Sequence, residues 1–146
     1  MEQRTCCFFG HRECFGLDEK ALLQKIEEQI KKGTTLFYVG NQGSFDAMVR
    51  SVLKKLQLRY PHIQYGVVLA YLPGKKDIYD DRKDTIYPEG LEVAPRKFAI
   101  VKRNRWMVEQ SAVCVCYINH TWGGAYKSVK FAERKGLEII NLGKVK

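Results

Sequence analysis

The sequence predicts an α/β fold in which a parallel sheet of about five strands carries helices on both faces. Apolar runs of strand length alternate along the chain with segments whose apolar residues recur at helical spacing. Strands separated by helix-length segments need crossover connections, which are right-handed and make the sheet parallel. The predicted order is βαβαβ, an irregular excursion and then αβαβ, in a single domain that spans residues 1–146.

The first half of the chain contains three predicted strands and two predicted helices. Asp18 is a suitable N-cap for the first helix, and Gly33 ends it. The second helix begins near Ser44 with the clearest amphipathic spacing in the chain, and Pro61 ends it. Strands are expected at 4–9, 35–39 and 64–71, and helices at 18–32 and from 44 to just before 61.

Residues 73–96 interrupt this alternation. They contain three of the four prolines and a charge-rich stretch from Asp77 to Asp84, which indicates an irregular excursion without a further helix or strand. Such an excursion is either a lid or a solvated loop, and the sequence leaves both open. Beyond it, helices are expected at 97–110 and 124–135, and strands at 112–118 and 137–142.

Composition limits the class of protein. The chain has 25 Lys and Arg against 16 Asp and Glu, a net charge of +9, and 45% hydrophobic residues, which excludes a disordered tail or a coiled coil. Because no apolar stretch is long enough to span a bilayer and the first residues show no signal-peptide pattern, we expect a soluble cytoplasmic protein. The positive charge predicts an anionic partner of unspecified kind.

The five cysteines do not suggest a disulfide scaffold. Their number is odd, and Cys6, Cys7, Cys114 and Cys116 lie in apolar, strand-forming runs instead of loops. We expect them to be small buried apolar residues and not metal ligands.

Three polar or glycine-rich turns follow predicted strands. They are Gly10-His11-Arg12, Gly40 to Asp46, and Asn119 to Gly124. The carboxyl ends of parallel strands lie on one edge of the sheet, where such folds bind their ligands. Glycines there allow close approach of the backbone, and the N-terminus of the next helix attracts an anion. Two such turns side by side predict a phosphate cradle, although neither matches the dinucleotide or P-loop fingerprint.

Three segments carry a resemblance to a known family. They are Gly40-Asn41-Gln42-Gly43-Ser44-Phe45-Asp46 before an amphipathic helix, Arg103-Asn104-Arg105-Trp106-Met107, and Trp122-Gly123-Gly124 at the start of a helix. In order and spacing the chain resembles the SLOG superfamily, which includes the Lonely Guy phosphoribohydrolases and the Rossmann-like domain of the DNA-processing protein A family. The opening Phe9-Gly10-His11-Arg12 is similar to that of small stand-alone bacterial and phage members. The resemblance implies a single Rossmann-like domain, a nucleotide or ADP-ribose-like ligand, and a homodimer.

The comparison with Lonely Guy enzymes also implies that this protein lacks their hydrolase activity. Those enzymes combine an R-K-x-x-M helix with a P-G-G-x-G-T-x-x-E turn, whose Arg and Glu are implied to cleave the bond between base and ribose. Arg103 and Met107 match the first motif, and Gly123 and Gly124 match the paired glycines. Lys130 occupies the glutamate position, where a cation opposes the positive charge that develops on the sugar. Hydrolase activity is therefore not expected, and no catalytic residue is assigned.

Several side chains have a structural alternative. Trp122 is either a base-stacking residue or a core residue. Ser44 and Asp46 either contact the ligand or serve as N-cap and first-turn carboxylate. Lys127 and Lys130 are expected to direct positive charge at the glycine turn before their helix.

The predicted site contains no metal or cofactor. His11, Cys14 and His120 match no zinc-ligand spacing, so we expect hydrogen-bonded structural histidines in place of a metal site or a Cys-His nucleophile. The predicted ligand-binding residues are Gly10, His11, Arg12, Gly40, Asn41, Gln42, Gly43, Ser44, Asp46, Arg103, Asn104, Thr121, Trp122, Gly123, Gly124 and Lys127.

Three function classes remain, none of which involves a membrane. The preferred one is a domain that senses or sequesters a nucleotide or ADP-ribose-like ligand. The second is a nucleotide-processing hydrolase with a different residue set, in which Asp46 is the acid or base. The third is single-stranded DNA binding, which the charge permits, although the basic residues are not interleaved with aromatic residues as in stacking platforms.

Overall fold

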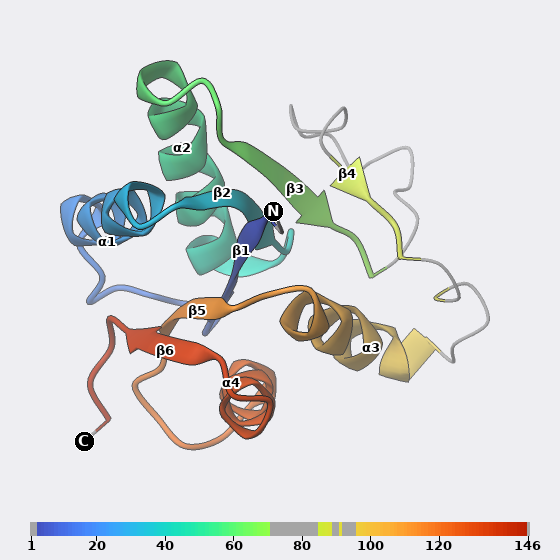
Figure 1. Ribbon diagram of the computed structural model, residues 1–146. Helices are drawn as coiled ribbons and strands as arrows, with labels where there is room; N and C mark the ends of the chain where they lie inside the picture. Colours follow the sequence, from blue (N-terminus) through green and yellow to red (C-terminus); the bar gives the residue numbers. More distant parts are fainter. Residues whose placement is uncertain (1–2, 71–84, 89–90, 92–95, 146) are drawn as a thin grey trace, which may run out of the picture.

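The computed structural model describes residues 3–70, 85–88, 91 and 96–145. Within them the chain forms one parallel sheet with helices on both faces, as the sequence predicts (Figure 1). The elements are β1 (Arg4–Gly10), α1 (Glu19–Lys31), β2 (Thr34–Val39), α2 (Gly43–Arg59), β3 (Gln64–Val68), β4 (Thr85–Ile86), α3 (Arg96–Glu109), β5 (Val113–Tyr117), α4 (Gly124–Arg134) and β6 (Glu138–Asn141). No helix in these ranges is both long and apolar enough to cross a membrane.

The sheet has the strand order β4-β3-β2-β1-β5-β6, and every neighbouring pair is parallel. The chain builds outward from β1 through β2 and β3 to β4, and then returns to place β5 against the other side of β1. The strand order therefore reverses at β1. Folds of this type bind ligands at the carboxyl ends of the strands beside the reversal. The topology thus brings the turns after β1 and β5 next to each other.

Alternate side chains of β1 enter two different cores. Cys6 and Phe8 belong to the core beneath α1 and α2, whereas Cys7 and Phe9 belong to the core beneath α3 and α4. Figure 1 shows these two helix pairs on opposite faces of the sheet. Because both faces of the strand are buried, its sequence is a continuous apolar run without polar alternation.

Residues 73–96 are expected to contain no further helix or strand, but the structure has a short strand there. Thr85 and Ile86 form β4 and pair with Val67 and Val68 of β3, so the sheet has six strands where about five are expected. The Leu69 amide also donates to the Ile86 carbonyl at 2.7 Å. A strand of two residues is too short to produce a periodic pattern in the sequence. The lid or loop predicted from this excursion otherwise lies largely outside the described residues.

The bounds of the elements follow local signals. Asp18 accepts a hydrogen bond from the Lys20 amide at 3.2 Å, which confirms the predicted N-cap of α1. The third strand is predicted to extend to residue 71, but β3 ends at Val68. Leu69 and Ala70 are buried outside the strand, so their apolar character reflects burial.

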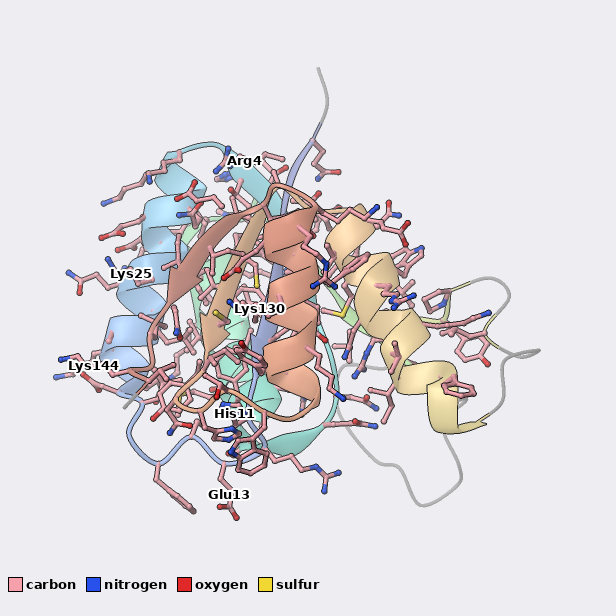
Figure 2. All side chains as sticks on the ribbon, turned by 90° about the horizontal axis from the view of Figure 1, so that it is seen from below. Arg4, His11, Glu13, Lys25, Lys130 and Lys144 are labelled. Carbon is pink, nitrogen blue, oxygen red and sulfur yellow. The ribbon has the colours of Figure 1, made fainter. Side chains whose placement is uncertain are left out.

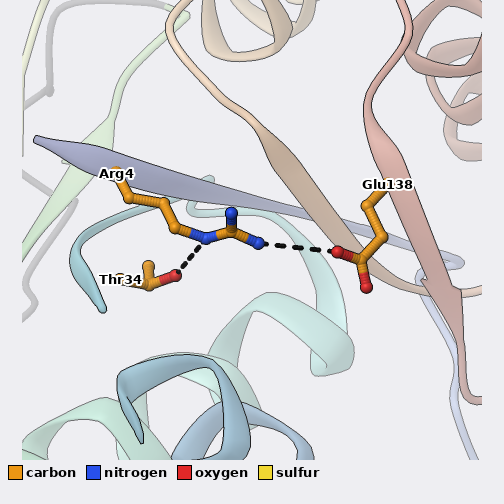
Figure 3. Close-up of polar contacts among 3 residues, drawn as sticks. All are labelled: Arg4, Thr34 and Glu138. Atoms are coloured by element: carbon orange, nitrogen blue, oxygen red, sulfur yellow. Dashed lines mark hydrogen bonds and ion pairs between the residues drawn. The ribbon is translucent and has the colours of Figure 1, made fainter. Parts of the chain in front are cut away.

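The amino edge of the sheet is tied together by Arg4. Its Nε donates to Thr34 Oγ1 at 3.1 Å, and its Nη2 donates to Glu138 Oε1 at 3.5 Å (Figure 3). The side chain thereby links β1 to the first residues of β2 and β6. Figure 2 shows Arg4 and His11 toward opposite ends of the molecule, so this polar cluster is remote from the carboxyl edge.

All five cysteines are buried free thiols. Cys7 and Cys114 are register partners in β1 and β5, and Cys116 belongs to the same core. Hydrogen bonds with the Cys116 and Cys7 thiols, together with burial, raise the pKa of Cys114 well above its ordinary value. A thiol that stays protonated in an apolar core packs as a small apolar side chain.

Candidate functional site

A cavity of about 830 Å³ opens at the carboxyl edge of the sheet. Its walls come from the turns after β1, β2 and β5, from α3 and from the start of α4. The predicted site residues that line it are Gly10, His11, Arg12, Gly40, Gln42, Asp46, Arg103, Asn104, Trp122, Gly123 and Gly124. The predicted residues that do not line it are Asn41, Gly43, Ser44, Thr121 and Lys127. Residues from all three predicted turns thus meet at one cavity.

The inner wall of the cavity holds a buried carboxyl group and a buried guanidinium. Asp46 is 8% exposed and Arg103 is 4% exposed. A Cβ added at Gly40 would lie 2.8 Å from Asp46 Oδ2 and 2.9 Å from Arg103 Nη1. Both side chains therefore press against the Gly40 backbone, and only glycine leaves room for them.

Arg103 is held in place by the fold around it. Its Nη1 donates to the Val68 carbonyl at 2.9 Å, and its Nε donates to Asn104 Oδ1 at 2.7 Å. Asn104 Nδ2 donates to Ser128 Oγ at 3.0 Å, and that hydroxyl donates to the Gly124 carbonyl at 3.0 Å. A continuous chain of hydrogen bonds thus connects the guanidinium on α3 with the first turn of α4.

Asp46 titrates close to neutral pH. Burial raises its pKa to about 6, against the opposing effects of a hydrogen bond from the Gln42 amide and the charges of Arg103 and Arg50. The Gln42 amide donates to Asp46 Oδ2 at 3.0 Å. A carboxyl group with this pKa is present in both protonation states near neutral pH, which general acid or base chemistry requires.

The first turn of α2 forms hydrogen bonds with the turn that follows β1. Ser44 donates to the Arg12 carbonyl through its amide at 2.8 Å and through its hydroxyl at 2.6 Å. Gly43 has a φ of +85°, and a Cβ there would lie 2.9 Å from Arg12 Cα, so the position requires glycine for two reasons. The N-cap is Gln42 and not Ser44. Gly43 and Ser44 therefore hold the Arg12 turn in place.

The first turn of α4 is open by contrast. Its first intrahelical hydrogen bond runs from the Lys127 amide to the Gly123 carbonyl at 3.1 Å, so the amides of residues 124–126 precede the bonded part of the helix. The N-cap Gly123 supplies no side-chain cap, and a Cβ added at Gly124 meets no atom of the described chain within 4 Å. This helix N-terminus therefore offers amide donors and the positive end of its dipole at the cavity.

Three aromatic rings stack beside this turn. The ring centroids of His11 and His120 are 3.5 Å apart with an interplanar angle of 14°, and those of His120 and Trp122 are 3.8 Å apart with an angle of 22°. All three residues line the cavity. Trp122 is 68% exposed, which excludes the alternative of a core residue.

The two imidazoles in this stack have buried nitrogens without partners. Within the ranges that the structure describes, His11 Nε2 and His120 Nδ1 are buried and make no hydrogen bond. The hydrogen-bonded structural histidines expected from the sequence are therefore not found at these two atoms. Burial, with a smaller contribution from His120, lowers the pKa of His11. Figure 2 shows His11 with Glu13 at the end of the molecule opposite Arg4.

The ring stack depends on strand pairing, which the sequence does not encode locally. Gly10 of β1 is the register partner of Tyr117 of β5, and the His11 amide donates to the Tyr117 carbonyl at 3.3 Å. This pairing brings together residues that follow two distant strands. His120, which is absent from the predicted binding set, becomes the middle ring. Phe15 also lines the cavity and is not among the predicted residues. Its loop contains no motif that would mark it as a ligand-binding residue.

Lys127 and Lys130 do not direct their charge at the cavity. Lys130 Nζ pairs with Glu133 at 3.3 Å and lies 5.4 Å from the centre of the Tyr126 ring. Figure 2 shows Lys130 part-way along α4. Lys127 is exposed, and neither lysine lines the cavity. Among the described residues, the arginine side chains that line it are Arg12 and Arg103.

The fold and the cavity together define the class of protein. It is a Rossmann-like α/β protein with a cavity at the carboxyl edge of its sheet, and the cavity volume of about 830 Å³ is typical of small-molecule sites. No model of a known protein family matches the chain, and neither does any curated protein sequence. The residues around the cavity are therefore the basis for assigning a function.

Proposed function

We propose that this protein binds a nucleotide or an ADP-ribose-like phosphorylated ligand in the cavity, and that it senses or sequesters this ligand. The observation that carries the proposal is the open first turn of α4, where Gly123 and Gly124 line the cavity. A phosphate at this turn accepts hydrogen bonds from the amides and is stabilised by the helix dipole. Membership of the SLOG superfamily is part of the proposal, because the segments that resemble it contribute to this cavity.

Preorganisation of the turn supports the proposal. The hydrogen bonds from Asn104 to Ser128 and from Ser128 to Gly124 fix the start of α4 relative to Arg103. Binding then requires little ordering of the site, which lowers its entropic cost. Arg12 and Arg103 add positive charge at the same cavity. The charge of Arg103 is offset by Asp46 only when that carboxyl group is ionised.

A valine at position 124 tests the site. Because a Cβ there meets no described atom within 4 Å, Gly124→Val adds bulk beside the open amides without a clash in the fold. We expect it to abolish binding of AMP and ADP-ribose in calorimetry and to leave thermal unfolding of the unliganded protein unchanged. Position 123 is less suitable, because its φ of +95° would strain any valine.

Ala47→Val is the matched control for this experiment. Ala47 is exposed in the first turns of α2 and does not line the cavity, so the same β-branched side chain should have no effect on binding there. In the wild-type protein, a ligand at 100 times its dissociation constant should add about 2.7 kcal/mol of stability. Equal affinity in wild type and Gly124→Val would refute the proposed phosphate position.

A hydrolase that uses Asp46 is the second candidate function. The observation in its favour is a buried carboxyl group on the cavity wall with a pKa of about 6. We expect no release of adenine from AMP, because Lys130 replaces the Lonely Guy glutamate and pairs with Glu133. Mass spectrometry of the incubated mixture measures this. Release of adenine by wild type that Asp46→Asn abolishes would make the protein a hydrolase.

A further inference from the structure

Trp122 is the outer ring of the stack that it forms with His11 and His120. His120 lies between the other two rings, so one face of Trp122 is already covered by an imidazole. The tryptophan is nevertheless 68% exposed. A large aromatic side chain that is fixed from behind and open in front loses little conformational freedom when a flat group stacks on it.

The stack is unsuited to two other roles. The rings of His11 and His120 are within 14° of parallel at a centroid distance of 3.5 Å, so their in-plane lone pairs point along parallel planes and do not converge on one metal ion. Among the described residues, no three His, Cys, Asp or Glu side chains form a group that could hold a metal ion. Trp122 is also too exposed to stabilise the fold as a core residue.

We infer that the open face of Trp122 is the subsite for the base of the ligand, and that the ligand is built on a nucleoside monophosphate. This inference rests on the proposed function, which places the phosphate at the first turn of α4. Trp122 precedes Gly124 by two residues, so the two subsites are separated by at most ~7 Å of backbone. One ribose separates base and phosphate in a nucleoside monophosphate unit, which suits this short span.

The inference predicts a difference between ligands with and without a base. Stacking of a base on an aromatic side chain tolerates any base, and its removal costs roughly 5- to 150-fold in affinity. AMP, GMP, CMP and UMP should therefore all bind more tightly than ribose 5-phosphate. The difference among the four nucleotides should be smaller than the difference between each of them and ribose 5-phosphate.

Two variants of Trp122 separate stacking from general apolar contact. Trp122→Phe keeps an aromatic plane, whereas Trp122→Leu keeps apolar bulk without one. In calorimetry with the full chain, we expect AMP affinity to fall roughly 5- to 150-fold in Trp122→Leu and by much less in Trp122→Phe. The affinity for ribose 5-phosphate should be the same in all three proteins. Thermal unfolding of the variants checks that the fold is kept.

Tryptophan fluorescence gives an independent readout. The chain has two tryptophans, and Trp106 packs against Tyr38 at a centroid distance of 5.0 Å without lining the cavity. In a Trp106→Phe background, AMP should change the emission of Trp122, and ribose 5-phosphate should leave it unaltered.

The outcomes distinguish the two proposals. If ribose 5-phosphate binds as tightly as AMP, or if Trp122→Leu weakens both equally, the base subsite is refuted and the phosphate site stands. If neither AMP nor ribose 5-phosphate binds, the proposed function and the base subsite are both refuted.

Discussion

Asp46 of α2 and Arg103 of α3 meet at the backbone of Gly40, although their helices cover opposite faces of the sheet (Figure 1). The contact is possible because β2 ends at Val39, so side chains from both faces reach around the end of the strand. The charged groups lie in the cavity wall and not on the protein surface. The two helix layers are therefore coupled at the place where a ligand would bind.

Gly40→Ala should destabilise the protein. The added Cβ would lie 2.8 Å from Asp46 Oδ2 and 2.9 Å from Arg103 Nη1, so the buried pair must move apart. We expect a loss of ~1–3 kcal/mol in the free energy of unfolding, measured by urea denaturation. Gly124→Ala is the matched control, because its Cβ meets no described atom within 4 Å. Equal stability of Gly40→Ala and wild type would show that the pair is not packed against this backbone.

Asp46 should make the protein less stable as the pH rises from about 4 to about 6. Its pKa is raised from 3.8 to about 6 by burial, so within this window the folded state holds a proton that the unfolded state has lost. The stabilisation is complete below pH 4 and is lost through pH 6, with an upper limit of roughly 3 kcal/mol. Asp46→Asn removes the titration. Urea denaturation of both proteins at pH 4 and 7.5 measures the difference, and parallel pH profiles would contradict the assignment.

His11 should have the opposite effect on the acid side of neutrality. Its pKa is lowered from 6.5, mainly by burial, so the unfolded chain takes up a proton that the folded state resists. Wild type should therefore lose stability relative to His11→Phe as the pH falls through 6.5. The phenyl ring keeps a stacking partner for His120 without titrating. Thermal unfolding between pH 5 and 8 tests this, and a constant difference between the two proteins would count against it.

Binding to DNA should be undetectable at physiological salt. The most prominent cluster of cations and an aromatic ring among the described residues surrounds Phe131, where Arg105, Arg134 and Lys135 lie 5.3, 6.0 and 5.4 Å from the ring centre. The Phe131 ring thus already interacts with cationic side chains of the protein itself. A DNA-binding protein with six to ten phosphate contacts would lose roughly 10³ or more in affinity between 50 and 200 mM salt. Sub-micromolar affinity for single-stranded DNA in a gel shift at 150 mM salt would contradict this prediction and favour DNA binding as the function.

We propose that the protein is a homodimer that pairs through α3. Phe98 and Val101 are one turn apart on this helix and are 49% and 47% exposed. Light scattering should give about twice the monomer mass of 16.9 kDa, and Val101→Asp should lower it. Leu58→Asp, at an exposed apolar position on α2, is the control. If the wild-type protein has the mass of a monomer, the proposed dimer is wrong. If Val101→Asp is still a dimer, the protein does not pair through α3.

The parallel α/β architecture was predictable because each long element carries its own periodic signal. The amphipathic spacing of α2 and the N-cap Asp18 are local properties of the chain. β4 was not predictable, because Thr85 and Ile86 are a strand only by virtue of pairing with β3. The roles of Gly43 and Ser44 were also hidden, since a glycine that accommodates Arg12 has the same sequence pattern as one that accommodates a phosphate.

The position of the cavity was predictable, but its chemistry depends on contacts between distant segments. Parallel topology alone places the three turns at one edge of the sheet. The stacking of His11 on His120 and the approach of Asp46 to Arg103 require the strand order and the path of α3, which no short motif specifies. The sequence motifs therefore identified many of the wall residues but missed others, among them His120 and Phe15.

The central place of β1 affects how the protein must assemble during synthesis. Cys6 of β1 pairs with Val113 of β5, so one edge of β1 stays unpaired during synthesis until β5 has been made. Contacts of such long sequence separation slow folding and leave a strand edge exposed to other chains. Fragments that end before β5 should therefore aggregate, and the wall formed by His11 and His120 should be among the last parts of the protein to form.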